Sequence, residues 1–133
     1  MNKFNRTLPQ IINFSAGLLL FVLGLIGYFN PEWFFTEKYD IVTPTAQSRT
    51  ILRVMMGFMT TVGAFWLYAF YVVNQQRLLR LTAGLTIGFI LSRVGGLFLD
   101  GWNQEFTYLE LGFEILALIF IGIALRFNKP PLS

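Results

Sequence analysis

The chain has 133 residues, of which 55% are hydrophobic and 13% are charged, and its formal net charge is +3 at pH 7. This charged fraction is about half that of an average soluble domain, and together with long apolar runs it places the chain in a lipid bilayer. The sequence has no cysteine and no histidine, which excludes disulfides, thiolate nucleophiles and the commonest side-chain ligand of transition metals.

Four apolar stretches predict membrane-spanning helices within a single domain covering residues 1–133. They lie at about 11–29, 51–73, 79–99 and 106–125, and each is near the ~20 residues that a helix needs to cross the hydrocarbon core. The first stretch is longer than the apolar part of a signal peptide, and no A-x-A cleavage site follows it, so we expect a retained helix. The predicted fold class is all-α, a polytopic membrane four-helix bundle.

The segment between the first two stretches is the longest loop of the predicted topology. Its aromatic residues Trp33 and Phe34 are of the kind that settles at headgroup level. Because proline suits the first position of a helix, Pro31 predicts a short interfacial helix over 31–36. Thr45 and Ser48 are both candidates to cap the second membrane-spanning helix.

Lysine and arginine predict the orientation of the helices, because they are enriched in cytoplasmic loops. The basic residues before the first stretch, around the loop that joins the second and third stretches, and after the fourth fall on one side of a four-span topology; they are Lys3, Arg6, Arg77, Arg80, Arg126 and Lys129. We therefore predict that both termini are cytoplasmic. Arg49 is the exception, because it lies on the outer side at the entrance to the second stretch.

Small residues recur at spacings that place them on one helical face, where they allow close approach of helices in lipid. These are Gly17 with Gly24, Gly57 with Ala64, and Gly84 with Gly88. We expect them to pack helices within the chain. Dimerisation through the G-x-x-x-G of Gly84 and Gly88 is the alternative.

Four charged residues lie well inside the apolar stretches, away from their ends: Arg53, Arg93, Glu110 and Glu114. A charge at such a position costs roughly 3 kcal/mol on insertion scales, so a compensating group is expected nearby. At 1.5 Å rise per residue, Arg93 and Glu114 each lie about 10–14 Å from the outer ends of their helices. We predict that Arg93 pairs with Glu114, and that Arg53 lies close to Glu110.

Two interpretations of these charges remain open. They are either ion pairs that fix the register of the helices, or an outward-facing polar pocket that binds a small molecule, a lipid headgroup or an ion, or docks a partner. The candidate residues of this cluster are Arg49, Arg53, Arg93, Asp100, Glu110 and Glu114. Glu110 and Glu114 have the oxygens that Mg²⁺ or Ca²⁺ prefers, but neighbouring arginines oppose a cation, so we predict neither a metal site nor a cofactor.

The arrangement of these residues resembles a known family. Arg53 early in the second stretch is followed by Gly57, Arg93 late in the third precedes Asp100-Gly101, and Glu114 lies in the fourth. Over roughly 11–126 the chain is similar to the small bacterial membrane proteins of domain-of-unknown-function family 4345. The resemblance implies a four-helix protein of the bacterial inner membrane and implies no activity.

The sequence favours a membrane protein without enzymatic machinery, either a small accessory subunit or a protein that binds a ligand or lipid in the Arg/Glu pocket. The alternative is a membrane enzyme acting on an apolar or lipid substrate, with Glu110 or Glu114 as acid or base, since a desolvated carboxyl suits proton transfer. The expected partners are membrane lipid and a protein subunit or second copy. The sequence has no basic patch interleaved with exposed aromatic residues, so we expect no nucleic-acid partner.

Overall fold

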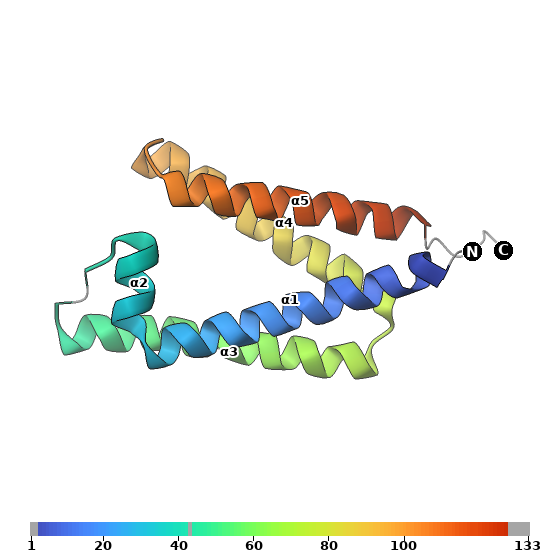
Figure 1. Ribbon diagram of the computed structural model, residues 1–133, viewed down its shortest axis with the longest axis horizontal. Coiled ribbons are helices and arrows are strands. Elements are labelled where there is room, and N and C mark those ends of the chain that lie inside the picture. Colours follow the sequence, from blue (N-terminus) through green and yellow to red (C-terminus); the bar gives the residue numbers. More distant parts are fainter. Residues whose placement is uncertain (1–2, 43, 128–133) are drawn as a thin grey trace. The chain divides into compact units, whose positions relative to one another are not determined.

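The computed structural model describes residues 3–42 and 44–127. Its helices are α1 (Lys3–Phe29), α2 (Pro31–Tyr39), α3 (Ala46–Val72), α4 (Gln75–Asp100) and α5 (Glu105–Phe127) (Figure 1). No strand occurs among the described residues, which confirms the predicted all-α fold class. Residues Thr7–Phe29 of α1 and the whole of α3, α4 and α5 are each long and apolar enough to cross a membrane. The chain is therefore a multi-pass membrane protein.

Helices α3 and α4 begin before the apolar stretches that predicted them, because hydropathy marks only the apolar part of a helix and the cap fixes its start. At α3 the hydroxyl of Thr45 accepts a hydrogen bond from the Ser48 N–H at 3.1 Å, and the Ser48 hydroxyl accepts one from the Thr45 N–H at 3.1 Å. This reciprocal pair confirms the predicted cap. At α4 the side chain of Asn74 accepts from the Gln76 N–H at 2.9 Å.

The short helix predicted over 31–36 is present as α2, which continues to Tyr39. Pro31 occupies its first turn, as expected from the fixed φ of proline. The helix is capped at its C-terminal end by Asp40, whose φ of 53° is left-handed and whose N–H donates to the Thr36 carbonyl at 3.1 Å. Phe34 and Phe35 are buried with Met56 of α3, so one face of α2 is fixed to α3 by apolar contact.

The chain divides into two compact units, and α1 contributes to both. The α1/α3 unit comprises residues 14–72, and the α4/α5 unit comprises residues 1–13 and 73–133. Each unit has its own packing and its own polar residues, and each is described by itself. The expectation of a single domain stays a prediction. Lys129, one of the basic residues that predict orientation, lies outside the described residues.

In the α1/α3 unit the two long helices run along each other in close contact (Figure 1). A Cβ atom added to Gly63 would lie 2.4 Å from the backbone nitrogen of Phe21, and one added to Gly24 would lie 2.6 Å from that of Thr60. One added to Gly17 would lie 3.2 Å from Leu67. Glycine is therefore required for this separation of the helices, and the predicted packing role of Gly17 and Gly24 is confirmed.

The prediction for the facing surface of α3 was wrong by one residue. Gly63, and not Ala64, makes the close approach, and Ala64 is exposed. A Cβ on Gly57 would make only an ordinary contact, 3.6 Å from the Tyr28 ring. Neighbouring positions on a helix lie about 100° apart around its axis, so Gly63 and Ala64 cannot both face α1.

In the α4/α5 unit the core is formed by Leu79, Ile121 and Ala124, all of which are buried. Leu8 and Ile12, from the part of α1 that belongs to this unit, pack against the same core. Within the unit a Cβ on Gly84 or Gly88 would meet nothing within 4 Å. A packing role for that G-x-x-x-G therefore stays a prediction.

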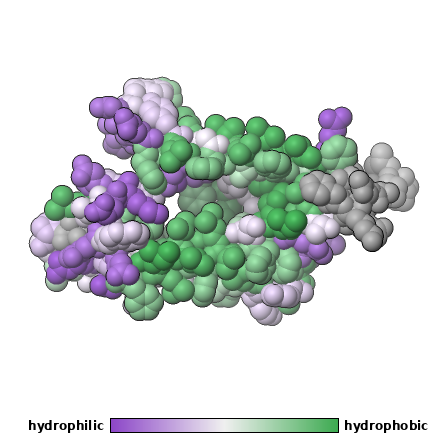
Figure 2. All heavy atoms as spheres, viewed as in Figure 1, coloured by the Kyte–Doolittle hydropathy of each residue, from purple (hydrophilic) through white to green (hydrophobic). Residues whose placement is uncertain are grey.

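Large apolar side chains are exposed along the length of the long helices, as expected for surfaces that face lipid tails. Examples are Phe58 and Phe65 on α3, Leu91 on α4 and Phe113 on α5. Figure 2 shows hydrophobic colours over the middle of the helices and hydrophilic colours gathered near their ends. Exposed apolar area of this extent is not stable in water and is normal in a bilayer.

Candidate functional site

The α4/α5 unit contains an ion-pair triad formed by Arg93 of α4 and by Glu110 and Glu114 of α5. The Arg93 Nε donates to Glu114 Oε1 at 2.8 Å, and its Nη1 contacts Glu110 Oε2. Glu110 and Glu114 are four residues apart and so lie on the same face of α5. The predicted pair of Arg93 with Glu114 is confirmed, and Glu110 is a second partner of the same guanidinium.

The triad is largely buried, with exposed side-chain fractions of 25% for Arg93, 20% for Glu110 and 18% for Glu114. One guanidinium faces two carboxylates, so the set carries one more negative than positive charge. The planar fork of arginine can contact two acceptors at once, which a lysine ammonium does with less geometric definition. The contacts join α4 to α5, as the first interpretation of these charges expects; their role in fixing the register stays a prediction.

A second polar network lies in the same unit, nearer the start of α4. Asn13 of α1 is fully buried, and its amide donates to the Gln75 carbonyl at 3.0 Å and to Gln75 Oε1 at 2.9 Å. Its oxygen accepts from the Thr82 hydroxyl at 3.0 Å. Sequence reasoning missed this network, although a lone asparagine in an apolar stretch signals that partners are needed, because an unpaired amide in lipid is costly.

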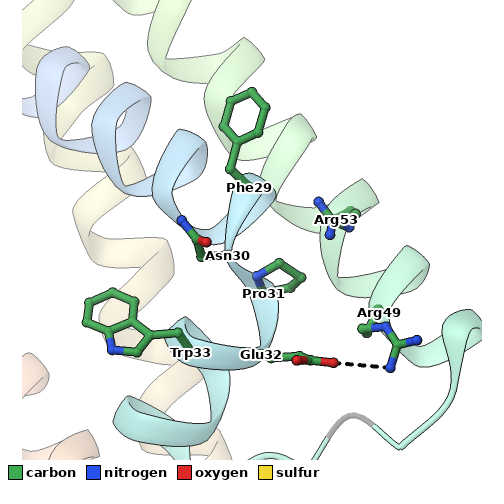
Figure 3. A pocket seen from close by; sticks show the side chains of 7 residues that line it. All are labelled: Phe29, Asn30, Pro31, Glu32, Trp33, Arg49 and Arg53. Atoms are coloured by element: carbon green, nitrogen blue, oxygen red, sulfur yellow. Dashed lines mark hydrogen bonds and ion pairs between the residues drawn. The ribbon is translucent and has the colours of Figure 1, made fainter.

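The α1/α3 unit has its own charged group where α1, α2 and α3 meet (Figure 3). Arg49 of α3 forms an ion pair with Glu32 of α2, 3.1 Å between Nη1 and Oε1. One turn further along α3, Arg53 donates from Nη1 to the Tyr28 carbonyl at the end of α1, and its guanidinium lies 5.9 Å from the Tyr28 ring centroid. Arg53 contacts no carboxylate among the described residues.

These arginines line a pocket with a cavity volume of about 420 Å³. Its lining residues are Phe29, Asn30, Pro31, Glu32, Trp33, Arg49 and Arg53. Figure 3 shows Arg49 and Glu32 directed at each other across the pocket, with Arg53 on the same side as Arg49. Two guanidinium groups and one carboxylate line it, so the pocket has an excess of one positive charge.

The predicted cluster residues therefore fall into three places. Arg93, Glu110 and Glu114 form the triad, Arg49 and Arg53 line the pocket, and Asp100 lies exposed at the end of α4 without an ion pair among the described residues. The expected proximity of Arg53 and Glu110 joins residues of different units and stays a prediction, as does one pocket formed by all six.

Glu32 is the charged residue of the pocket that sequence reasoning missed. Its signal was available, because an acidic residue in the first turn of a helix is stabilised by the helix dipole at that end.

The triad and the pocket also differ in the ligands that they could bind. Among residues 3–42 and 44–127 no three His, Cys, Asp or Glu side chains come together as a metal site would require. The pocket, with its positive excess, suits an anion.

Comparison with known proteins agrees with the sequence resemblance. No curated protein and no solved structure matches the chain. The model of the family described as "Domain of unknown function (DUF4345)" matches residues 8–125, which include every residue of the triad, the polar network and the pocket. The chain therefore belongs to the DUF4345 family.

Proposed function

We propose that the protein is a non-catalytic membrane protein that binds an amphiphilic ligand in the pocket between α2 and α3. The observation that carries the proposal is Arg53, a charged residue within a candidate membrane span that contacts no carboxylate among the described residues. A charge in such a segment is costly, and the Tyr28 carbonyl satisfies one donor of Arg53 without neutralising its charge. A bound ligand with a polar head supplies a further partner for Arg53.

The surroundings of the pocket fit the two ends of an amphiphile. Arg49 and Arg53 lie in the first two turns of α3, where the polar start of the helix gives way to its apolar part. Phe29 and Trp33 line the pocket and are more than half exposed, and aromatic rings of this kind settle at headgroup level. The head of a ligand can therefore contact the arginines while its tail follows the apolar exposed faces.

Retention of a ligand during purification tests this proposal. Native mass spectrometry of the protein, extracted gently from its own membrane, is expected to show a bound lipid or small molecule that an Arg53→Gln variant loses. The control is Arg80→Gln, which removes an exposed arginine from the first turns of α4, outside the pocket. Equal retention in both variants, or no bound molecule in the unaltered protein, would contradict the proposal. Bound protein subunits would support an accessory role instead.

We also propose a location in a bacterial inner membrane with both termini in the cytoplasm, supported by the distribution of basic residues. The pocket then faces the outer side. Because the chain has no cysteine, a single introduced cysteine reports on which side of the membrane its own position lies. A cysteine at Asn103, between α4 and α5, is expected to react with a membrane-impermeant maleimide on intact cells. A cysteine at Gln76 is expected to react only after lysis, and the reverse pattern would invert the topology.

An enzymatic role for Glu110 or Glu114 is less well supported than binding. Both carboxylates contact Arg93, and a carboxylate that is held by a guanidinium is less available as a general acid or base. The sequence offers neither histidine nor cysteine to complete a nucleophilic or proton-relay group. We therefore assign the triad to holding α4 against α5 and the pocket to binding.

A further inference from the structure

We infer that the ligand of the pocket carries a phosphate headgroup. We also infer that Glu32 forms an ion pair with Arg49 until the phosphate takes the place of the Glu32 carboxylate. This inference rests on the proposed binding function and names the chemical class of the ligand. It is carried by the pairing of Arg49 with Glu32, by the carboxylate-free Arg53 one turn away and by the pocket that they line.

The donors around the pocket exceed what a carboxylate ligand can accept. Arginine presents five N–H groups in a planar fork, and Arg53 gives one hydrogen bond to the Tyr28 carbonyl. Asn30 also lines the pocket; its side-chain oxygen caps no N–H of α2, and its side-chain NH2 group is a further donor of the lining. A phosphate offers three strong acceptor oxygens, and arginine forks match its geometry.

The ion pair between Glu32 and Arg49 is of the kind that a ligand can exchange. Its exposed side-chain fractions are 63% for Glu32 and 35% for Arg49, and exposed pairs contribute little to stability. In the absence of a ligand, Glu32 thus forms only a weak ion pair with the Arg49 guanidinium. When a phosphate enters, it takes the place of the carboxylate, and Glu32 can turn to solvent.

The charge balance favours the same exchange. With Glu32 in place the pocket has two guanidinium groups and one carboxylate. A phosphate monoester carries about −1.5 to −2 charge near neutral pH, so on Arg49 and Arg53 it neutralises most or all of their charge, while Glu32 is left on an exposed face of α2. Glu32 therefore acts as an internal competitor, and its removal should tighten binding rather than weaken it.

Calorimetric titration of the full chain in a non-ionic, phosphate-free detergent tests the inference. The probes are short-chain phosphatidic acid, the diacylglycerol with the same chains, and inorganic phosphate. Phosphatidic acid is expected to bind, and diacylglycerol is not. Arg53→Gln is expected to weaken phosphatidic acid binding by about 10- to 100-fold, as for a lost hydrogen bond to a charged group.

The variant Glu32→Gln gives the sharper test, because a gain in affinity cannot result from misfolding. We expect it to bind phosphatidic acid up to about fivefold more tightly. The control is Glu37→Gln, which removes the same charge from an exposed position of α2 that does not line the pocket; its affinity should be unchanged. Weaker or unaltered binding by Glu32→Gln, or an equal gain with Glu37→Gln, would overturn the competition.

The outcomes for the three probes separate this inference from the proposed function. If diacylglycerol binds as tightly as phosphatidic acid and needs Arg53, amphiphile binding stands and the phosphate headgroup is wrong. If inorganic phosphate binds as tightly as phosphatidic acid, the phosphate is confirmed but its source is a soluble compound rather than a lipid. If no probe binds in an Arg53-dependent way, both the inference and the proposed function fall.

Discussion

Replacing Arg93 with glutamine is expected to lower the free energy of unfolding by about 3–5 kcal/mol, because it leaves two carboxylates buried without their cation. Glu114→Gln should cost less, since Arg93 and Glu110 then remain as a balanced pair. A triple variant with glutamine at all three positions should recover much of the loss. Titration with SDS in mixed micelles, followed by circular dichroism, measures each variant.

The Arg49–Glu32 pair is the matched control for this experiment. It consists of the same residue types, but its exposed fractions of 35% and 63% are well above those of the triad. Replacing either partner should therefore change the free energy of unfolding by less than about 1 kcal/mol.

The double variant of Arg93→Gln and Glu114→Gln tests the triad itself. If the two losses of unfolding free energy simply add, the two side chains do not interact, contrary to the geometry.

A second large effect is expected from Gly63→Ala. The added Cβ would lie 2.4 Å from the backbone nitrogen of Phe21 and 2.7 Å from its Cα, so the backbones of α1 and α3 must move apart at this contact. Overpacking usually costs about 1–3 kcal/mol, and a clash with backbone atoms belongs at the upper end because no side chain can rotate away. The same SDS titration measures the effect.

Gly84→Ala is the control for this prediction. Gly84 also lies in the interior of a long helix, but a Cβ there meets nothing within 4 Å in its unit. Removing the backbone freedom of glycine should stabilise α4 by roughly 0.5–1 kcal/mol. Equal destabilisation by the two substitutions would mean that helix contact at Gly63 is not what matters.

Periodicity and depth along the helices predicted much of the observed architecture. Hydropathy located the long helices, because burying backbone in lipid requires about 20 apolar residues in helical form. The pairing of Arg93 with Glu114 followed from matched depth, since helix rise is nearly constant. These quantities depend on local sequence alone, and for that reason they were predictable.

Contacts that depend on rotation about a helix axis, or on the path of a loop, were not predictable in the same way. A seven-residue spacing fitted Gly57 with Ala64, yet the contact face of α3 is centred on Gly63. The pairing of Glu32 with Arg49 depends on the turn at Asn30, whose φ of −125° and ψ of 62° lie outside any regular element. A hydropathy pattern does not encode such a turn.

The division of α1 between two units has a consequence for biogenesis. The partners of Asn13 in the buried polar network are Gln75 and Thr82, which lie 62 and 69 residues later in the chain. The ribosome therefore delivers Asn13 to the bilayer long before it delivers the groups that satisfy its amide. A nascent chain stopped after Val72 can complete the contact of α1 with α3, but the first helix retains an unsatisfied amide until α4 is synthesised and inserted.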